Sequence, residues 1–307
     1  MLQLYTAIWR VSGRRQLVLI ALSVAIAALA ALPLKFQQDI VNALTDGEAT
    51  ADTLFWLGAG MMGAILLSLA LKWLMGVRSG VLGEDIIRFI RKRLYTDTNR
   101  NQLEPSAIQT GTLTTAISAE AEELGKFAGS AYSEPVVQIG TLISVIGFIA
   151  STQPGLGAIA LAMIVPQVVL VLFTQGRINT LVANRVRLLR QATNQIGAAE
   201  TNTVVQSVLD EFDSIFEARR RMFIWKLSTK FLLSTINGVG TVAVLMLGGW
   251  LVLQGRTDVG TVVAATLGLA RLQAPTAFLI AFYRQVSANR VKFELLRDIL
   301  PPPVKSR

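Results

Sequence analysis

Six long apolar runs are the feature that most constrains this chain of 307 residues. A helix needs about 20 consecutive, mostly apolar residues to cross the hydrocarbon core of a bilayer. Runs of about this length lie at residues 17–34, 54–77, 132–150, 155–174, 231–253 and 259–283. We therefore predict an all-α membrane protein, in which residues 1–300 form one domain of six long transmembrane helices and residues 301–307 form a proline-rich tail.

The positions of the basic residues predict how the chain is oriented. Of the 29 Lys and Arg residues, 25 lie before the first span or after the second, fourth and sixth spans, and Lys72 lies near the end of the second span on the same side. Loops on the other side carry two, Lys35 and Arg256, and Arg271 lies inside the sixth span. Because basic residues concentrate in cytoplasmic loops, both termini are predicted to be cytoplasmic, in a plasma (inner) membrane. The net charge of +9 therefore predicts contact with membrane lipids and needs no nucleic acid to explain it.

The two long segments on the basic side, 72–135 and 175–230, carry helical periodicity, as in Ile86, Ile90 and Leu94. No proline occurs between Pro33 and Pro105 or between Pro166 and Pro275. We therefore expect the spans to continue as long helices into the cytoplasm, with a break at Pro105 and a turn near 197–203. On the opposite side we expect loops only, the longest at 35–53.

The residue inventory excludes most catalytic chemistry. The chain has no cysteine and no histidine, so disulfides, thiol chemistry, histidine triads and the usual zinc sites are excluded. It also lacks the Gly-x-x-x-x-Gly-Lys-Ser/Thr phosphate-binding loop. We predict no catalytic residue, no metal site and no bound cofactor, and any ATP or magnesium would be bound by a partner subunit.

Arg271 is the one charged residue in the middle of a span, with Gln273 and Pro275 close by in the sequence. A cation at this depth is costly unless it faces protein or water. Two interpretations stay open: Arg271 lines a translocation cavity and meets an anionic substrate, or it pairs with a carbonyl or carboxylate between helices. Gln138, a polar residue in the third span, is grouped with this candidate cavity, although such residues also form hydrogen bonds between helices.

Several short motifs occur in a suggestive order. Residues 255–260 read Gly-Arg-Thr-Asp-Val-Gly at the start of the sixth span, and residues 287–291 read Ser-Ala-Asn-Arg-Val near its end. Residues 110–113 read Thr-Gly-Thr-Leu, followed by Ile117 and Glu120. With six spans around them, these motifs resemble the transmembrane domain of the ABC exporter family over roughly residues 10–300.

The resemblance implies a dimer, with itself or with a homologous six-span subunit, in which spans four and five cross to the partner. It also implies two cytoplasmic coupling helices that dock an ATPase domain, near 103–111 and 198–205. The residues expected to dock are Leu103, Pro105, Ser106, Ile108, Thr110, Gly111, Glu200, Thr201, Asn202 and Thr203.

Three functions remain open at this point. The first is the membrane subunit of an ABC-type transporter, driven by a separate nucleotide-binding subunit, because the ATPase domain with which the family normally continues is not found before residue 307. The second is a proton-coupled transporter of the same fold, which would use Glu134, Asp39 or Glu120. The third is a membrane scaffold or accessory subunit that transports nothing.

Overall fold

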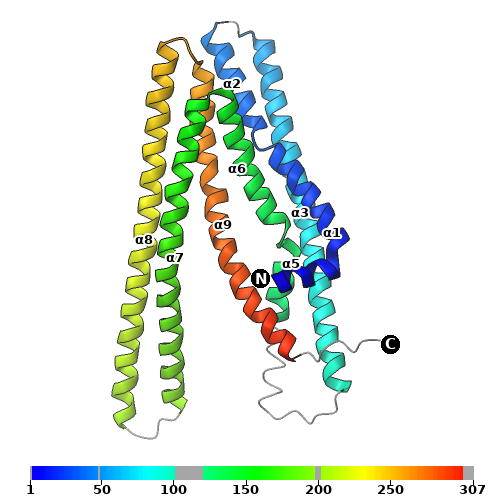
Figure 1. Ribbon diagram of the computed structural model, residues 1–307, viewed down its shortest axis with the longest axis vertical. Coiled ribbons are helices and arrows are strands. Elements are labelled where there is room, and N and C mark those ends of the chain that lie inside the picture. The colour runs from blue at the N-terminus through cyan, green and yellow to red at the C-terminus, as the bar shows by residue number, and fades with distance from the viewer. Residues whose placement is uncertain (1, 48, 101–119, 198–201, 300–307) are drawn as a thin grey trace.

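The computed structural model describes residues 2–47, 49–100, 120–197 and 202–299, and every regular element within these ranges is a helix. The helices are α1 (Leu2–Ala28), α2 (Leu32–Thr45), α3 (Ala51–Arg100), α5 (Ala121–Ser130), α6 (Ser133–Thr152), α7 (Pro154–Gly197), α8 (Asn202–Leu253) and α9 (Val259–Ile299). Figure 1 shows them as long rods that run roughly parallel to the longest axis of the molecule.

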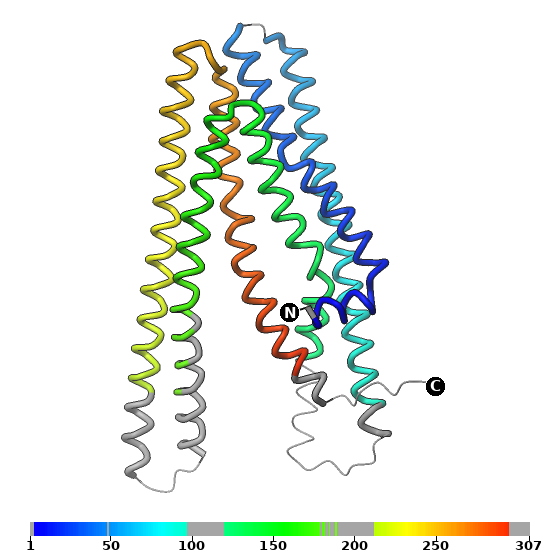
Figure 2. The backbone as a smooth tube through the Cα atoms, in the orientation of Figure 1, coloured from blue at the N-terminus to red at the C-terminus, as the bar shows by residue number. Residues whose placement is uncertain are grey.

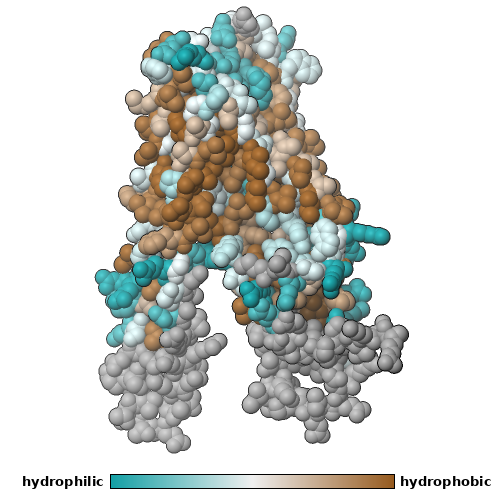
Figure 3. Space-filling view, in the orientation of Figure 1, coloured by the Kyte–Doolittle hydropathy of each residue, from teal (hydrophilic) through white to brown (hydrophobic). Residues whose placement is uncertain are grey.

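Six helical segments in the described residues are long and apolar enough to cross a membrane, which confirms the predicted number of spans. They extend well beyond the apolar runs: α3 continues to Arg100 and α9 to Ile299. The turn predicted near 197–203 lies mostly outside the described residues, since α7 ends at Gly197 and the next described residue, Asn202, begins α8. Apolar side chains gather in a band across the middle of the molecule, with hydrophilic ones toward both ends (Figure 3).

The prediction that residues 35–53 form an external loop was wrong. The chain breaks for only about one turn after Ala28 and continues as α2 to Thr45, which leaves a short connection before α3 begins at Ala51. The reason is the position of Pro33, which lies in the first turn of α2, where its missing N–H and fixed φ cost nothing. Asp39, expected in a solvated loop, is therefore part of a helix that packs against α9 and α3.

The helices form two groups that diverge toward one end of the molecule (Figures 1 and 2). The first group contains α1, α2, α3, α5, α6 and α9, which pack on one another. The second is the hairpin of α7 and α8, whose most extensive packing is between its own two helices and which touches the first group mainly through α6 and α9. Within the hairpin, Gln167 Nε2 donates to Asn237 Oδ1 at 2.9 Å, so Gln167 does join two helices as such residues do.

The end toward which the two groups diverge carries most of the basic residues and is called the basic end. Close helix packing there depends on small residues. A Cβ on Gly129 of α5 would lie 2.5 Å from the carbonyl oxygen of Ser79 on α3, and one on Gly83 would lie 3.2 Å from the carbonyl oxygen of Gly125. The spacing Gly125-x-x-x-Gly129 therefore allows the two backbones to touch. A cluster of buried apolar residues, including Leu82, Leu94 and Phe127, continues the contact.

Candidate functional site

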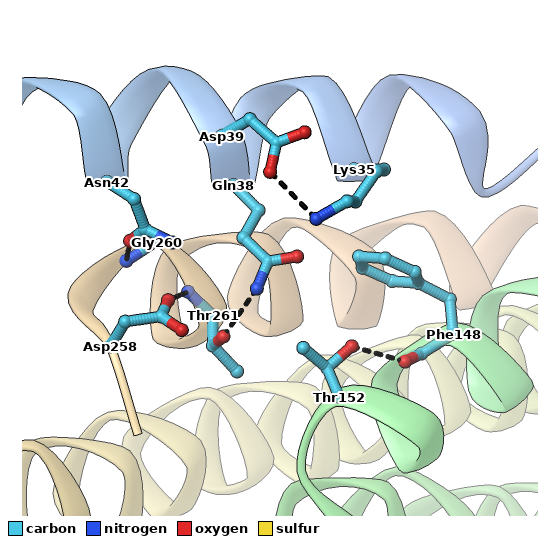
Figure 4. A network of polar contacts seen from close by, with 9 residues as sticks. All are labelled: Lys35, Gln38, Asp39, Asn42, Phe148, Thr152, Asp258, Gly260 and Thr261. Carbon is cyan, nitrogen blue, oxygen red and sulfur yellow. Dashed lines mark hydrogen bonds and ion pairs between the residues drawn. The ribbon is translucent and has the colours of Figure 1, made fainter. Parts of the chain in front are cut away.

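A polar face on α2 lies against the start of α9, at the end of the molecule opposite the diverging tips of the two groups (Figure 4). Lys35, Gln38, Asp39 and Asn42 recur at spacings of three, four and seven residues, which places them on one side of a helix. This face was not predicted, because residues 35–53 were expected to form a loop. The spacing itself was the available signal.

Two side chains of α2 hold the first turn of α9. Gln38 Nε2 donates to Thr261 Oγ1 at 2.7 Å, and Asn42 Oδ1 accepts the backbone N–H of Gly260 at 2.8 Å. Asp258 caps the same turn, since its Oδ1 accepts the backbone N–H of Thr261 at 2.6 Å. Two N–H groups that a helix start leaves unpaired thus have partners, one of which comes from another helix.

The carboxylate of Asp258 is held in its charged form. Burial raises its pKa, but the hydrogen bonds from the side chain and backbone of Thr261 and from Asn42 and Gln38 outweigh burial, so the pKa lies below its ordinary value. A negative charge at the start of α9 also interacts favourably with the positive end of that helix dipole. Nearby, Lys35 Nζ donates to Asp39 Oδ1 at 2.7 Å, which neutralises the two charges of the polar face on α2.

The register of α2 and α9 shows how far along its span Arg271 lies. The two helices run antiparallel, with Asn42 opposite Gly260 and Ala30 opposite Arg271, whose Nη1 lies 3.4 Å from the carbonyl oxygen of Ala30. Eleven residues of helix separate Gly260 from Arg271, or roughly 16 Å. Half of a hydrocarbon core is about 15 Å. Arg271 is therefore about half a hydrocarbon core away from the start of its span, as expected from its place in the middle of the sixth apolar run.

The break between α1 and α2 provides the partner of Arg271. In a continuous helix the carbonyl of Ala30 would accept the N–H of Leu34, but that N–H donates to Ala31 at 2.9 Å. The freed carbonyl oxygen accepts the guanidinium across the helix contact. The single bond is long, and the side chain of Arg271 stays exposed. Both interpretations of Arg271 keep support, since it ties two helices and remains open on one side.

The other predicted cavity residues lie on two helices, with Gln273 and Pro275 within about one turn of Arg271 on α9 and Gln138 on α6. On α9, Gln273 is exposed and Pro275 is buried. A Cβ on Gly268 would contact Ile149 of the antiparallel helix α6, which sets the register of those two helices. Gln138 precedes Ile149 by eleven residues, so it lies at the level of about residue 279, roughly 12 Å along the axis from Arg271.

The residues predicted to dock an ATPase lie almost entirely outside the described ranges. Residues 101–119 and 198–201 hold all of them except Asn202 and Thr203, which begin α8. The predicted docking role therefore stays a prediction for every one of these positions.

Within the described residues, the six helices of membrane-spanning length are those of a multi-pass membrane protein. The family model described as "ABC transporter transmembrane region" matches residues 17–276. The chain therefore belongs to the ABC transporter transmembrane region family, as its motifs predict. A search of curated proteins found no match.

Proposed function

We propose that this chain is a membrane-spanning subunit that forms the substrate pathway of an ABC-type transporter, and that a separate ATPase subunit drives it. The carrying observation is the divergence of the α7–α8 hairpin from the other helices, which it contacts mainly through α6 and α9 (Figure 1). Two copies, or one copy and a homologous subunit, would pack the diverging hairpins against each other's helices by exchanging them. The family match supports the same assembly.

The assembly is tested by co-purification. A chain with one affinity tag is expressed together with a copy that carries a second tag, purified in mild detergent on the first tag, and measured by mass spectrometry. We expect the second copy, or a homologous membrane subunit, together with a nucleotide-binding subunit in stoichiometric amount. ATPase activity should be absent from the isolated chain and present in the complex. Recovery of the chain alone, or with no nucleotide-binding subunit, would contradict the ATP-driven function and leave proton-coupled transport or the scaffold role.

We propose further that Arg271 faces the substrate pathway and meets anionic groups there. The support is its mid-membrane depth, its exposed side chain and its single long hydrogen bond. The chain has no cysteine, so single cysteines can be introduced directly. We expect Arg271→Cys to react with a charged, membrane-impermeant thiol reagent, because that chemistry needs water.

Two matched controls on α9 sharpen this test. Leu272 is buried, with 5% of its surface exposed, and Leu267 is exposed at 40% but apolar. Cysteines at both should stay unmodified, the first because nothing reaches it and the second because it faces lipid. If Arg271→Cys is as unreactive as these controls, Arg271 serves only as a structural tie between α9 and Ala30.

One observation keeps proton coupling as a second candidate. Asp39 lies on the polar face of α2 and not in an external loop, which gives a carboxylate a place inside the helix packing. Its Oδ1 atom pairs with Lys35 Nζ at 2.7 Å. An Asp39→Asn variant with unchanged transport driven by a proton gradient would exclude Asp39 as the coupling residue.

A further inference from the structure

A cavity of about 910 Å³ lies between the amino-terminal part of α1 and the middle of α3, at the basic end of the apolar band. It is lined on α1 by residues 9–15 and Leu17, and on α3 by Leu82, Asp85, Ile86, Arg88, Phe89 and Lys92. Ligand pockets for small organic molecules have volumes of about 300–1,000 Å³, so the cavity is large enough for such a ligand. None of the functions above uses it.

The cavity carries an excess of positive charge. Five basic side chains and one carboxylate line it, which leaves four net positive charges (the residues are Arg10, Arg14, Arg15, Arg88, Lys92 and Asp85). Arg15 Nη1 contacts Asp85 Oδ2 at 2.5 Å and joins the two walls. Within the described residues, the other four basic groups have no ion-pair partner, so an anion placed among them would relieve their mutual repulsion.

The rest of the lining is apolar and aromatic. Trp9 is 40% exposed, Phe89 47% and Leu17 56%. Trp9 is held edge-on against Tyr132 with ring centroids 5.5 Å apart, so its position is fixed by packing. Leu17 is the first residue of the first apolar run, which places the cavity where hydrocarbon meets the basic side. Aromatic and basic residues together are typical of that boundary.

We infer that this cavity binds the headgroup of an anionic phospholipid, with its acyl chains along the exposed apolar surface that begins at Leu17. A ligand that is both anionic and apolar satisfies the two halves of the lining, whereas a free phosphate uses only the basic half. Basic pockets between transmembrane helices on the cytoplasmic side are suited to anionic headgroups. The bound lipid would reinforce the contact between α1 and α3 that Arg15 and Asp85 begin.

The binding is measured by native mass spectrometry of the purified protein in detergent, titrated with phosphatidylglycerol or with phosphatidylcholine of the same chain length. We expect a clear preference for phosphatidylglycerol. The double variant Arg14→Gln/Arg88→Gln should lose about fivefold in affinity for each charge removed, roughly 25-fold in all. A conservative variant, Arg14→Lys/Arg88→Lys, should keep most of the binding and shows that any loss follows charge and not misfolding.

A matched control removes two other arginines of the same predicted membrane side. Arg177 and Arg284 are exposed and do not line the cavity, so Arg177→Gln/Arg284→Gln should bind phosphatidylglycerol like the wild-type protein. Equal loss in both double variants would mean that the lipid responds to overall charge, which overturns the inference. Equal binding of the two lipids by the wild-type protein would overturn it as well.

Two further measurements separate a lipid site from a phosphate site. Glycerol phosphate, the headgroup without chains, should fail to displace phosphatidylglycerol at equal concentration. If it displaces the lipid, the cavity binds phosphate alone and the lipid assignment is wrong. The fluorescence of Trp9 is the difference between the wild-type protein and Trp9→Phe. Phosphatidylglycerol with brominated chains should quench this Trp9 fluorescence, and an absence of quenching would place the lipid elsewhere.

Discussion

The close approach of α2 and α9 at Gly260 makes Gly260→Ala the most informative single substitution. A Cβ there would lie less than 3.0 Å from the carbonyl oxygen of Gln38 and from Oδ1 of Asn42, whereas ordinary contact begins at 3.4 Å. The two helices must therefore separate by several tenths of an ångström. The hydrogen bond from Gly260 N–H to Asn42, now 2.8 Å, would reach or pass the upper limit for such bonds, about 3.2 Å.

The cost of this substitution is best isolated by a control. Overpacking of a tight contact costs about 1–3 kcal/mol. Alanine also favours the helix over glycine by up to about 1 kcal/mol, a gain that a control glycine in a helix shares. Gly249 of α8 is suitable, because a Cβ there meets no atom within 4 Å. We expect Gly260→Ala to be less stable than Gly249→Ala by about 1–3 kcal/mol.

Thermal unfolding of both variants in one detergent measures the difference, which should be a fall of roughly 2–10 °C in the melting temperature. Asn42→Ala supplies a second test, since it removes one of the two oxygens that the new methyl group meets. In that background Gly260→Ala should cost less than it does alone, because the two sites share a contact. If Gly260→Ala melts together with Gly249→Ala, the α2–α9 contact is not as tight as we describe, and the reasoning fails.

Three further predictions concern other contacts. The folded-state pKa of Asp258 is lowered from 3.8, so its charged carboxylate stabilises the fold above that pH, and this stabilisation is lost as the pH falls through the folded-state pKa. The difference in melting temperature between the wild-type protein and Asp258→Asn should therefore stay constant from about pH 7 to 5 and vanish in stronger acid. Gly129→Ala should destabilise by about 1–3 kcal/mol through its contact with α3, whereas Gly147→Ala, which meets no atom within 4 Å, should not destabilise, as compared by thermal unfolding. Gln167→Leu leaves the side-chain amide of Asn237 on α8 without its partner and should lower the stability of the fold by about 0.6–2 kcal/mol. An unchanged melting temperature would contradict this prediction.

The long helices were predictable because their signals are local. The proline-free stretch after Pro33 and the apolar runs predicted α3 and the six spans. Pro33 misled the prediction of the external loop. A proline at the end of an apolar run suits either the end of a helix or the first turn of the next one, and only the packing of α2 against α9 decides between them.

The candidate site was predictable only in part. The depth of Arg271 followed from its place in an apolar run, but its partner did not, because the free carbonyl of Ala30 exists only through the break before α2. The cavity near Trp9 depends on the contact of Arg15 with Asp85, seventy residues away along the chain. No periodicity indicates such a pair.

The hairpin of α7 and α8 has a mechanical consequence. Helix α8 has 52 residues, so it is about 78 Å long, and the hairpin touches the other helices mainly through α6 and α9. A rotation of about 5° around its attached end would carry the other end through about 7 Å, since that distance grows with the length of the rod. Gly248 of α8 meets α9 at Val262, near the attached end of the hairpin. A small shift there, which breaks no contact, would therefore move the far end of α8 by more than the rise of one helical turn, about 5.4 Å.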